Sequence, residues 1–131
     1  MTTWNLSSTR HHVLICNGGS CMRNGAEELT QAIREEIQRL GVENTIHTTR
    51  TRCNGRCEDA CVVIVYPEGI WYRGATPEIG REMVREHLLE GEALQSYISY
   101  SYQEDHFSPS PQSPIGISKP MLEQASNTGR S

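Results

Sequence analysis

Two pairs of cysteines, each directly behind a predicted β-strand, constrain the fold of this chain more than any other feature of its sequence. The first pair, Cys16 and Cys21, is separated by four residues and follows a short apolar segment. The second pair, Cys53 and Cys57, is separated by three residues and follows a segment rich in β-branched residues. Both kinds of segment are typical of strands. A fold in which the four thiols act together must therefore bring the ends of these two strands side by side.

The residues between the two pairs predict a helix, because their apolar side chains recur at helical spacing. Asn24 and Glu27 have the spacing of a capping box, and Gly41 provides a C-terminal stop. This helix connects the strand expected at 12–16 to the strand expected at 45–51, so the two strands should form a parallel pair with a right-handed crossover. Both cysteine loops then leave the sheet at the same edge. The apolar positions of the helix are Leu29, Ala32, Ile33, Ile37 and Leu40.

The remaining elements complete a small α/β fold. A third strand at 62–66 turns through Pro-Glu-Gly into a fourth at 70–72, which is a hairpin signal. A second helix is expected from Thr76 to Gly91, with Pro77 in its first position. The order β-α-β-β-β-α predicts a thioredoxin-like arrangement, in which a mixed sheet is flanked by two helices. The core side of the second helix should carry Ile79, Met83, Val84 and Leu88.

The 131 residues suit one domain with extensions at both ends. Residues 1–10 are polar and predict a flexible lead-in, and residues 11–102 carry the folded domain. From residue 103 to residue 131 the composition shifts to proline and serine, as in "SPSPQSP", with only scattered apolar residues. Such a segment cannot bury enough surface to offset its ordering entropy, so we expect a mostly disordered tail.

Composition and charge exclude several classes of protein. The net charge of −4 does not favour nucleic acid as a partner. No apolar run is long enough to cross a membrane, and the N-terminus lacks the apolar core of a secretory signal. We therefore expect a cytoplasmic protein whose thiols stay reduced. Five cysteines, an odd number, also argue against a disulfide framework and favour metal binding or redox work.

Four thiolates with no histidine or carboxylate at ligand spacing select a soft metal, either zinc or the iron of an iron–sulfur cluster. Zinc sites favour gaps of two residues, whereas the gaps here are wider. A [2Fe–2S] cluster spreads its ligands over two irons and tolerates such gaps. Flanking residues fit this interpretation: glycines allow close approach of the backbone, asparagines could donate to sulfur, and arginines would favour the reduced form. They are Gly18, Gly19 and Gly55, Asn24 and Asn54, and Arg23, Arg52 and Arg56.

The fifth thiol and the histidines are better explained without a role in the site. Cys61 opens the strand "VVIVY" and is expected to be a buried, inert side chain. No pair of histidines is spaced for a Rieske centre. His11, His12 and His47 are interpreted as strand or edge residues, and His87 as a helix residue near a polar boundary.

Longer motifs carry a resemblance to a known family. The stretch "TRCNGRCEDACVVIVYPEGIWYRGATPEIGREMVREHLLEG" resembles the second half of the thioredoxin-like [2Fe–2S] ferredoxins, and "HHVLICNGGSC" resembles their first ligand loop. The resemblance covers residues 11–95. It implies the thioredoxin-like fold, a homodimer, and one [2Fe–2S] cluster per chain. The ligands that it implies are Cys16, Cys21, Cys53 and Cys57.

Two features depart from the usual pattern of the family. The first cysteine gap is shorter than in many free-standing members and is like that of the cluster subunit of respiratory NADH dehydrogenases. Ala60 is followed by Cys61, where the family often has proline. Within the family, the chain resembles members found with the genes of anaerobic cobalamin synthesis.

These observations predict a one-electron carrier that serves redox partner proteins of unknown identity, rather than an enzyme. A zinc-stabilised interaction module and a subunit of the NADH-dehydrogenase type are the alternatives. Two enzyme classes fit poorly. A thiol oxidoreductase would need C-x-x-C at the helix start, and a cysteine phosphatase would need arginine where Met22 stands.

Overall fold

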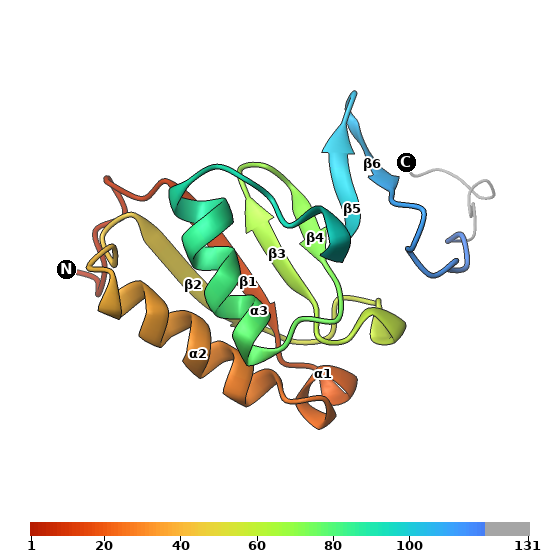
Figure 1. The fold of residues 1–131 in the computed structure, drawn as a ribbon, viewed down its shortest axis with the longest axis horizontal. Helices are drawn as coiled ribbons and strands as arrows, with labels where there is room; N and C mark the ends of the chain where they lie inside the picture. The colour runs from red at the N-terminus through yellow and green to blue at the C-terminus, as the bar shows by residue number, and fades with distance from the viewer. Residues whose placement is uncertain (120–131) are drawn as a thin grey trace.

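A computed structural model describes residues 1–119 of the chain. Its centre is one mixed sheet of six strands in the order β2-β1-β3-β4-β5-β6 (Figure 1). The predicted order β-α-β-β-β-α is present and is extended by two further strands. The strands are β1 (His11–Cys16), β2 (Ile46–Thr51), β3 (Val63–Tyr66), β4 (Ile70–Tyr72), β5 (Ile98–Gln103) and β6 (His106–Pro109). The helices are α1 (Gly19–Arg23), α2 (Ala26–Arg39) and α3 (Pro77–Glu82), which continues as the π-helical η2 (Met83–Leu89), with short 3-10 turns at η1 (Cys57–Asp59) and η3 (Gln95–Tyr97).

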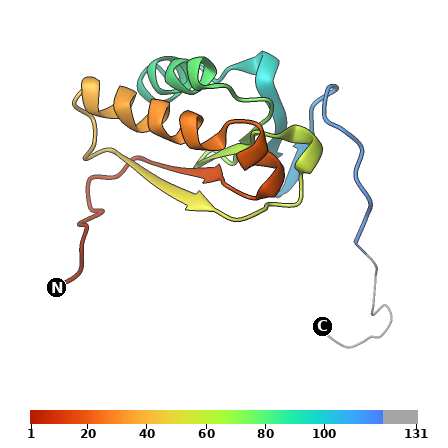
Figure 2. The same cartoon turned by 90° about the horizontal axis from the view of Figure 1, so that it is seen from below.

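The two long helices, α2 and α3, lie on the same face of the sheet, so the molecule has two layers (Figure 2). The core lies between the sheet and the two helices. Of the four core residues predicted for the second helix, Met83, Val84 and Leu88 are buried, and Ile79 is partly buried against the core. No helix among residues 1–119 is long and apolar enough to cross a membrane. Buried core residues include Val13, Ile15, Leu29, Ile33, Val63, Val65, Tyr72, Met83, Val84 and Leu88.

The predicted parallel pair is confirmed. β1 pairs in parallel with β2 over six positions, with His11 opposite Ile46 and Cys16 opposite Thr51. On its other side β1 pairs antiparallel with β3. Because β1 and β2 end at the same level, the loop after Cys16 and the loop after Thr51 emerge together. This register is what positions the candidate site.

The start of the first helix differs from the prediction. A short helix, α1, ends at Asn24, whose side-chain amide donates to the carbonyl of Ser20 at 2.7 Å. The cap of α2 is Gly25, in the left-handed region with φ of 94°. Asn24 is therefore the end of one helix rather than the start of the next, because its side chain bonds backward along the chain. The start of α3 is as predicted: Thr76 caps it by accepting from the amide of Ile79 at 3.2 Å.

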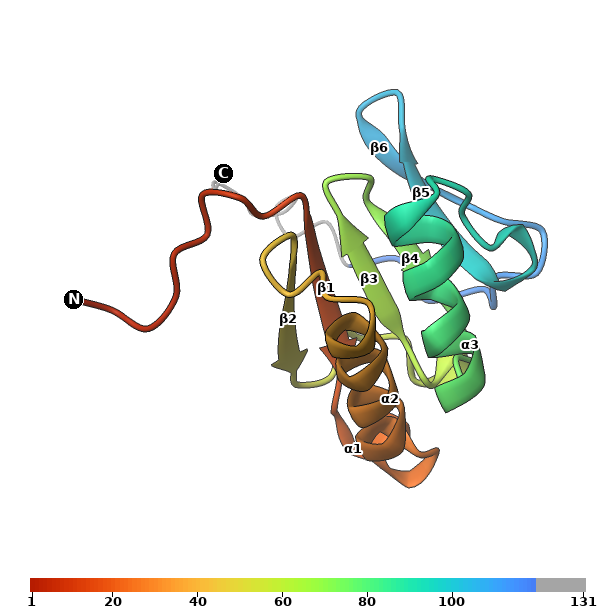
Figure 3. The same ribbon diagram turned by 60° about the vertical axis from the view of Figure 1, so that its left-hand side comes forward.

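The expectation of a disordered tail from residue 103 is wrong for residues 103–109, and the folded part of the chain extends past residue 102. β5 pairs antiparallel with β4, and β6 with β5 (Figure 3). This hairpin is added by backbone hydrogen bonds and by aromatic contacts, such as the edge contact between Trp71 and Phe107 with ring centroids 6.0 Å apart. Such an addition needs few apolar residues, so composition did not reveal it. Residues 120–131 lie outside the described residues.

A buried carboxylate ties the two helices together. Glu36 of α2 has a side chain only 2% exposed, because it lies on the apolar face of the helix, three residues after Ile33 and four before Leu40. It accepts hydrogen bonds from Arg39 of its own helix and from Arg81 and Arg85 of the second. The hydrogen bond from Arg39, aided by Arg85, lowers the pKa of Glu36 to about 2. Its ion pairs therefore stabilise the fold above pH 4.5 and are lost as the pH falls toward 2.

We expect Glu36→Gln to lower the free energy of unfolding at pH 7 by about 2 kcal/mol, because a buried charge partner is removed from three arginines. The three arginine side chains are 36–61% exposed, so solvent screening keeps the loss at the lower end of the usual range. Urea unfolding measures the loss.

The matched control is Glu35→Gln, one position earlier. Glu35 is 61% exposed and pairs with Arg81 alone, so its loss should stay below about 1 kcal/mol. Equal losses for the two variants would contradict the structural role of Glu36.

Candidate metal centre

The four cysteines of the two predicted pairs meet at one end of the sheet. Cys16 is the last residue of β1 and Cys21 lies in α1, whereas Cys53 and Cys57 lie between β2 and η1. All four line a single small pocket. Figures 1 and 2 show α1 and η1 side by side at this end. The tertiary structure therefore brings together the thiols that the sequence singled out. Gly18, Ser20, Arg56 and Val62 complete the lining.

Direct contacts join the two loops. The thiol of Cys16 donates to the carbonyl of Arg52 at 3.5 Å. The sulfurs of Cys53 and Cys57 are 3.8 Å apart, and the amide of Gly55 donates to the sulfur of Cys53 at 3.3 Å. Gly55 has φ of 81°, a conformation that favours glycine. The second loop is thus folded around the sulfur of Cys53.

The first loop packs directly against the second at Gly18. A Cβ atom added to Gly18 would lie 2.7 Å from the Cα of Cys53, which is closer than two such carbons can approach. Gly18 has φ of −69°, so an alanine there would meet no conformational penalty of its own. The glycine is needed for the close approach of the two loops.

The thiols differ sharply in exposure. Cys16 and Cys21 are each 3% exposed, whereas Cys53 and Cys57 are classed as exposed. Burial, together with the neighbouring Cys16, raises the pKa of Cys21 to about 12. Burial also opposes ionisation of Cys16, but hydrogen bonds from the Gly18 amide and its surroundings outweigh it and lower the pKa. The site therefore has an inner pair of thiols and an outer pair at the surface.

Cys61 is buried as predicted, 1% exposed, and it does not line the pocket of the other four. Its thiol donates to the carbonyls of Cys21 and Asn24, at 3.4 and 3.3 Å. Burial raises its pKa. The Cys61 side chain therefore packs beneath α1, and this packing explains why a cysteine stands at this position.

The donor set fits an iron–sulfur cluster in its chemistry. Four thiols and no imidazole or carboxylate line the pocket, and thiolates are the usual ligands of such clusters. Within residues 1–119, no three side chains of Cys, His, Asp or Glu are already gathered around a point that would hold one metal ion. The thiols share a pocket without being closed on a single centre.

The arginines do not all act as the sequence suggested. Arg56 is not a free cation beside the thiols, because its guanidinium pairs with Asp59 at 2.9 Å and is only 15% exposed. Asp59, 2% exposed, also pairs with Arg73. Arg23 donates to the hydroxyl of Ser20 at 3.2 Å. The sequence analysis missed Asp59, although its position three residues after an arginine in the ligand loop was a signal.

The asparagines are also engaged elsewhere. The side-chain amide of Asn54 donates to the hydroxyl of Thr51 at 2.7 Å and to the carbonyl of Arg52 at 3.1 Å. Together with the bond from Asn24 to Ser20, these contacts shape the loops. Asn54 also acts directly on one thiol, because hydrogen bonds from its side chain and backbone help to lower the pKa of Cys16.

The histidines lie away from the thiols. His12 and His47 stack on neighbouring strands, with ring centroids 5.0 Å apart, as strand residues should. His87 differs from the prediction, because it is 2% exposed and bonds to the hydroxyl of Tyr72 at 2.8 Å. Its other ring nitrogen contacts Glu68 at 3.3 Å.

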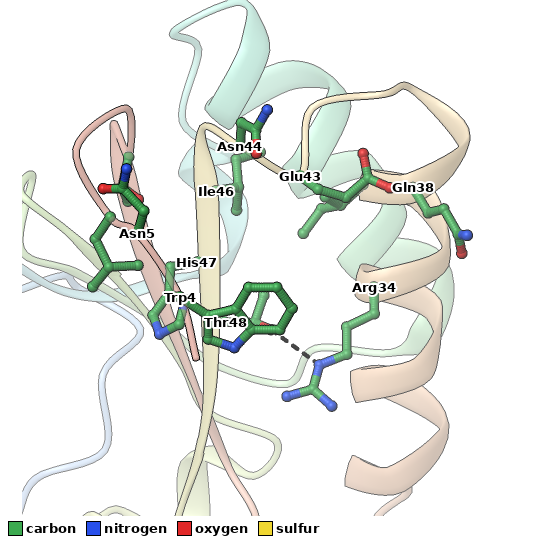
Figure 4. Close-up of a pocket in the computed structure, with 12 residues that line it drawn as sticks. Trp4, Asn5, Arg34, Gln38, Glu43, Asn44, Ile46, His47 and Thr48 are labelled. Atoms are coloured by element: carbon green, nitrogen blue, oxygen red, sulfur yellow. Dashed lines mark hydrogen bonds between the residues drawn. The ribbon is translucent and has the colours of Figure 1, made fainter. Parts of the chain in front are cut away.

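A larger hollow, of about 530 Å³, lies along the edge of β2 and contains none of the five cysteines (Figure 4). Trp4 of the lead-in stands on one side of it and α2 on the other. Arg34 reaches into it from α2, and its Nε donates to the hydroxyl of Thr48 at 3.0 Å. This hollow is separate from the thiol pocket.

Comparison with known proteins agrees with the fold and with the thiol chemistry. The family model for thioredoxin-like [2Fe-2S] ferredoxins matches residues 4–87. The chain belongs to this family. The cofactor of the family is a [2Fe–2S] cluster, as the donor set indicates, and the thioredoxin-like fold is confirmed.

Relatives are similar over most of their length. The chain is 53% identical over 107 residues to a protein of Priestia megaterium provisionally named a 2Fe-2S ferredoxin, covering 82% of this chain and 84% of that protein. It is 36% identical over 98 residues to a 2Fe-2S ferredoxin of Aquifex aeolicus, covering 66% and 86%. A solved structure of a thioredoxin-like [2Fe-2S] ferredoxin from Aquifex aeolicus matches with a TM-score of 0.69 at 32% identity, covering 74% of this chain and 96% of that chain.

We expect Gly18→Ala to lower the free energy of unfolding by about 1–3 kcal/mol, because the new methyl group must displace the backbone at Cys53. Denaturant unfolding of the purified protein measures the change.

Gly19→Ala is the matched control. Its Cβ would meet only the end of the Arg23 side chain, at 3.4 Å, and alanine is the better helix former in α1. It should leave stability unchanged or raise it by up to about 1 kcal/mol. A loss as large as that of Gly18→Ala would show that contact between the loops is not the cause.

Proposed function

We propose that this protein is a one-electron carrier whose [2Fe–2S] cluster is held by Cys16, Cys21, Cys53 and Cys57. The observation that carries the proposal is that both cysteine pairs, 31 residues apart in sequence, line one pocket. Family membership supports the kind of cofactor. The assignment of these four residues as ligands rests on the pocket and on the resemblance of their loops to the ligand loops of the family.

When bound, the cluster would supply the redox chemistry, because its pair of irons can accept one electron and release it again. The chain holds and tunes it. Cys16 and Cys21 anchor the inner side within the core, and Cys53 and Cys57 hold the outer side. The amide of Gly55 donates to the sulfur of Cys53, and hydrogen bonds to ligand sulfurs are among the features that set the potential of such a cluster.

The exposure of the outer thiols suits electron transfer between proteins. A partner that docks over Cys53 and Cys57 comes close to the cluster without any rearrangement of the core. The buried inner thiols keep water from that side. We infer that redox partner proteins approach the end of the sheet where α1 and η1 lie.

The direct test is an absorption spectrum of anaerobically purified protein, with iron and acid-labile sulfide assayed on the same sample. We expect a brown protein that contains about two irons and two sulfides per chain and bleaches with dithionite. A colourless protein with one zinc would instead favour the zinc-stabilised interaction module. Protein that stays free of both metals after reconstitution would contradict both functions.

We expect replacement by alanine of any one of Cys16, Cys21, Cys53 or Cys57 to abolish or severely destabilise the cluster, because each substitution removes one of four ligands. Cys61→Ala should retain the full iron content, since this thiol does not line the pocket of the other four and donates to two backbone carbonyls. Iron content and visible absorption after identical anaerobic purification measure the difference. If Cys61→Ala loses the cluster and Cys57→Ala keeps it, the ligand set is wrong.

The assembly state separates the two electron-transfer alternatives. We propose a homodimer, on the basis of the resemblance to the family, without nucleic acid or membrane as a partner and in the cytoplasm, where thiols stay reduced. Sedimentation of the iron-loaded protein should give twice the mass of one 14.7 kDa chain. Protein that is stable only within a large complex would favour a subunit of the NADH-dehydrogenase type.

The pathway is a narrower proposal. The resemblance to family members found with anaerobic cobalamin synthesis favours a role as electron donor in that synthesis. Deletion of the gene should then lower anaerobic cobalamin yield, and normal yield would contradict the role while leaving electron transfer intact.

A further inference from the structure

The C-terminal segment returns to the second cysteine loop after the β5–β6 hairpin. We propose that residues 110–116 position the ligand loop 53–57 by holding the side chain of Arg56, so that this segment helps to fix the geometry of the metal centre. The structural part of this inference rests on the contacts of Arg56, and its consequence for the cluster rests on the proposed function. Arg56 is the connecting residue because it lines the thiol pocket and directly precedes Cys57.

The guanidinium of Arg56 is held on several sides. Its Nε donates to Asp59 at 2.9 Å, and its Nη2 donates to the hydroxyl of Ser113 and the carbonyl of Pro114, each at 2.8 Å. Its carbon Cζ lies 5.0 Å from the ring centroid of Tyr100 in β5. A Cβ atom added to Gly116 would lie 3.1 Å from Nη1. The side chain is thus enclosed by the C-terminal part of the chain.

These contacts form a closed ring of hydrogen bonds. Ser99 donates its single hydroxyl proton to Asp59 at 2.8 Å, so Ser113, 2.9 Å away, must donate to Ser99. Ser113 in turn accepts from Arg56, which donates to Asp59. Asp59 sits at the end of η1, directly after the ligand loop, and is 2% exposed. Ser113 is the member that joins Arg56 to Ser99, so the loss of its hydroxyl opens the ring.

Contacts of Gly18 and Asn54 hold the start of the loop, whereas the side chain of Arg56 holds its end. Cys53 and Cys57 are exposed, and Gly55 adopts a left-handed conformation that only a flexible residue takes readily. The inner loop, in contrast, is packed into the core through Cys16 and Cys21. The match to the family model ends at residue 87, so Ser99 and Ser113 lie beyond the part of the chain that the family model covers.

Substitution of two matched arginines, Arg52 and Arg56, separates the effect of a fixed side-chain position from the effect of charge. Arg52 directly precedes Cys53 as Arg56 directly precedes Cys57, but Arg52 is exposed. Arg52→Gln and Arg56→Gln therefore remove the same charge from the same loop. A second pair tests the segment itself: Ser113→Ala breaks the ring, whereas Ser113→Thr keeps the hydroxyl.

Two readouts are taken on each purified variant. The first is the rate at which an iron chelator bleaches the anaerobic protein, and the second is hydrogen exchange of the backbone over residues 54–60. Arg56→Gln and Ser113→Ala should each raise both rates by about fivefold, as the loss of a net hydrogen bond implies. Arg52→Gln and Ser113→Thr should stay within about twofold of the wild type.

The outcomes are distinct. Wild-type rates in Ser113→Ala would overturn the proposal, and so would equal acceleration by Arg52→Gln and Arg56→Gln, since charge alone would then be the cause. If the wild-type protein binds no iron and sulfide, the proposed function fails. Hydrogen exchange would then still decide whether residues 110–116 hold the loop.

Discussion

The parallel pairing of β1 with β2 is the constraint on which the site depends. Because Cys16 stands opposite Thr51, the two loops that carry the cysteine pairs start at the same level of the sheet. The α2 helix makes this possible, since a parallel pair requires a crossover of its length. A slip of one position would turn every side chain of a strand to the opposite face. The buried residues of β1, Val13 and Ile15, oppose such a slip because they would leave the core.

The division of the thiols into an inner and an outer pair follows from that geometry. The first loop turns at once into α1, which packs Cys21 beneath the end of the sheet. The second loop follows the edge strand β2, and its thiols, Cys53 and Cys57, are exposed. A cluster held between two such loops would be anchored in the core and open to a partner, which suits electron transfer between proteins. The same openness leaves the outer loop dependent on contacts from elsewhere in the chain.

The arginines illustrate how charge read along a sequence differs from charge in a structure. Arg23, Arg52 and Arg56 stand alike beside cysteines, yet Arg56 is paired with Asp59 and enclosed by Tyr100. Asp59 is shared with Arg73, so the three side chains keep a net charge of +1, but Arg56 is fixed in position rather than free in solvent. Its contribution is to geometry, because it joins the end of the ligand loop to a distant segment.

The sequence alone determined the features that depend on local periodicity and on motifs: the strands up to residue 72, the bodies of both helices, the cap at Thr76, the burial of Cys61 and the four thiols of the site. These follow from side-chain spacing or from a resemblance carried by neighbouring residues. The tertiary structure decided what depends on partners far along the chain. The β5–β6 hairpin forms because β4 offers an edge. Ser113 reaches Arg56 across 57 positions, a contact that no local pattern encodes because its free energy exists only once the sheet has formed.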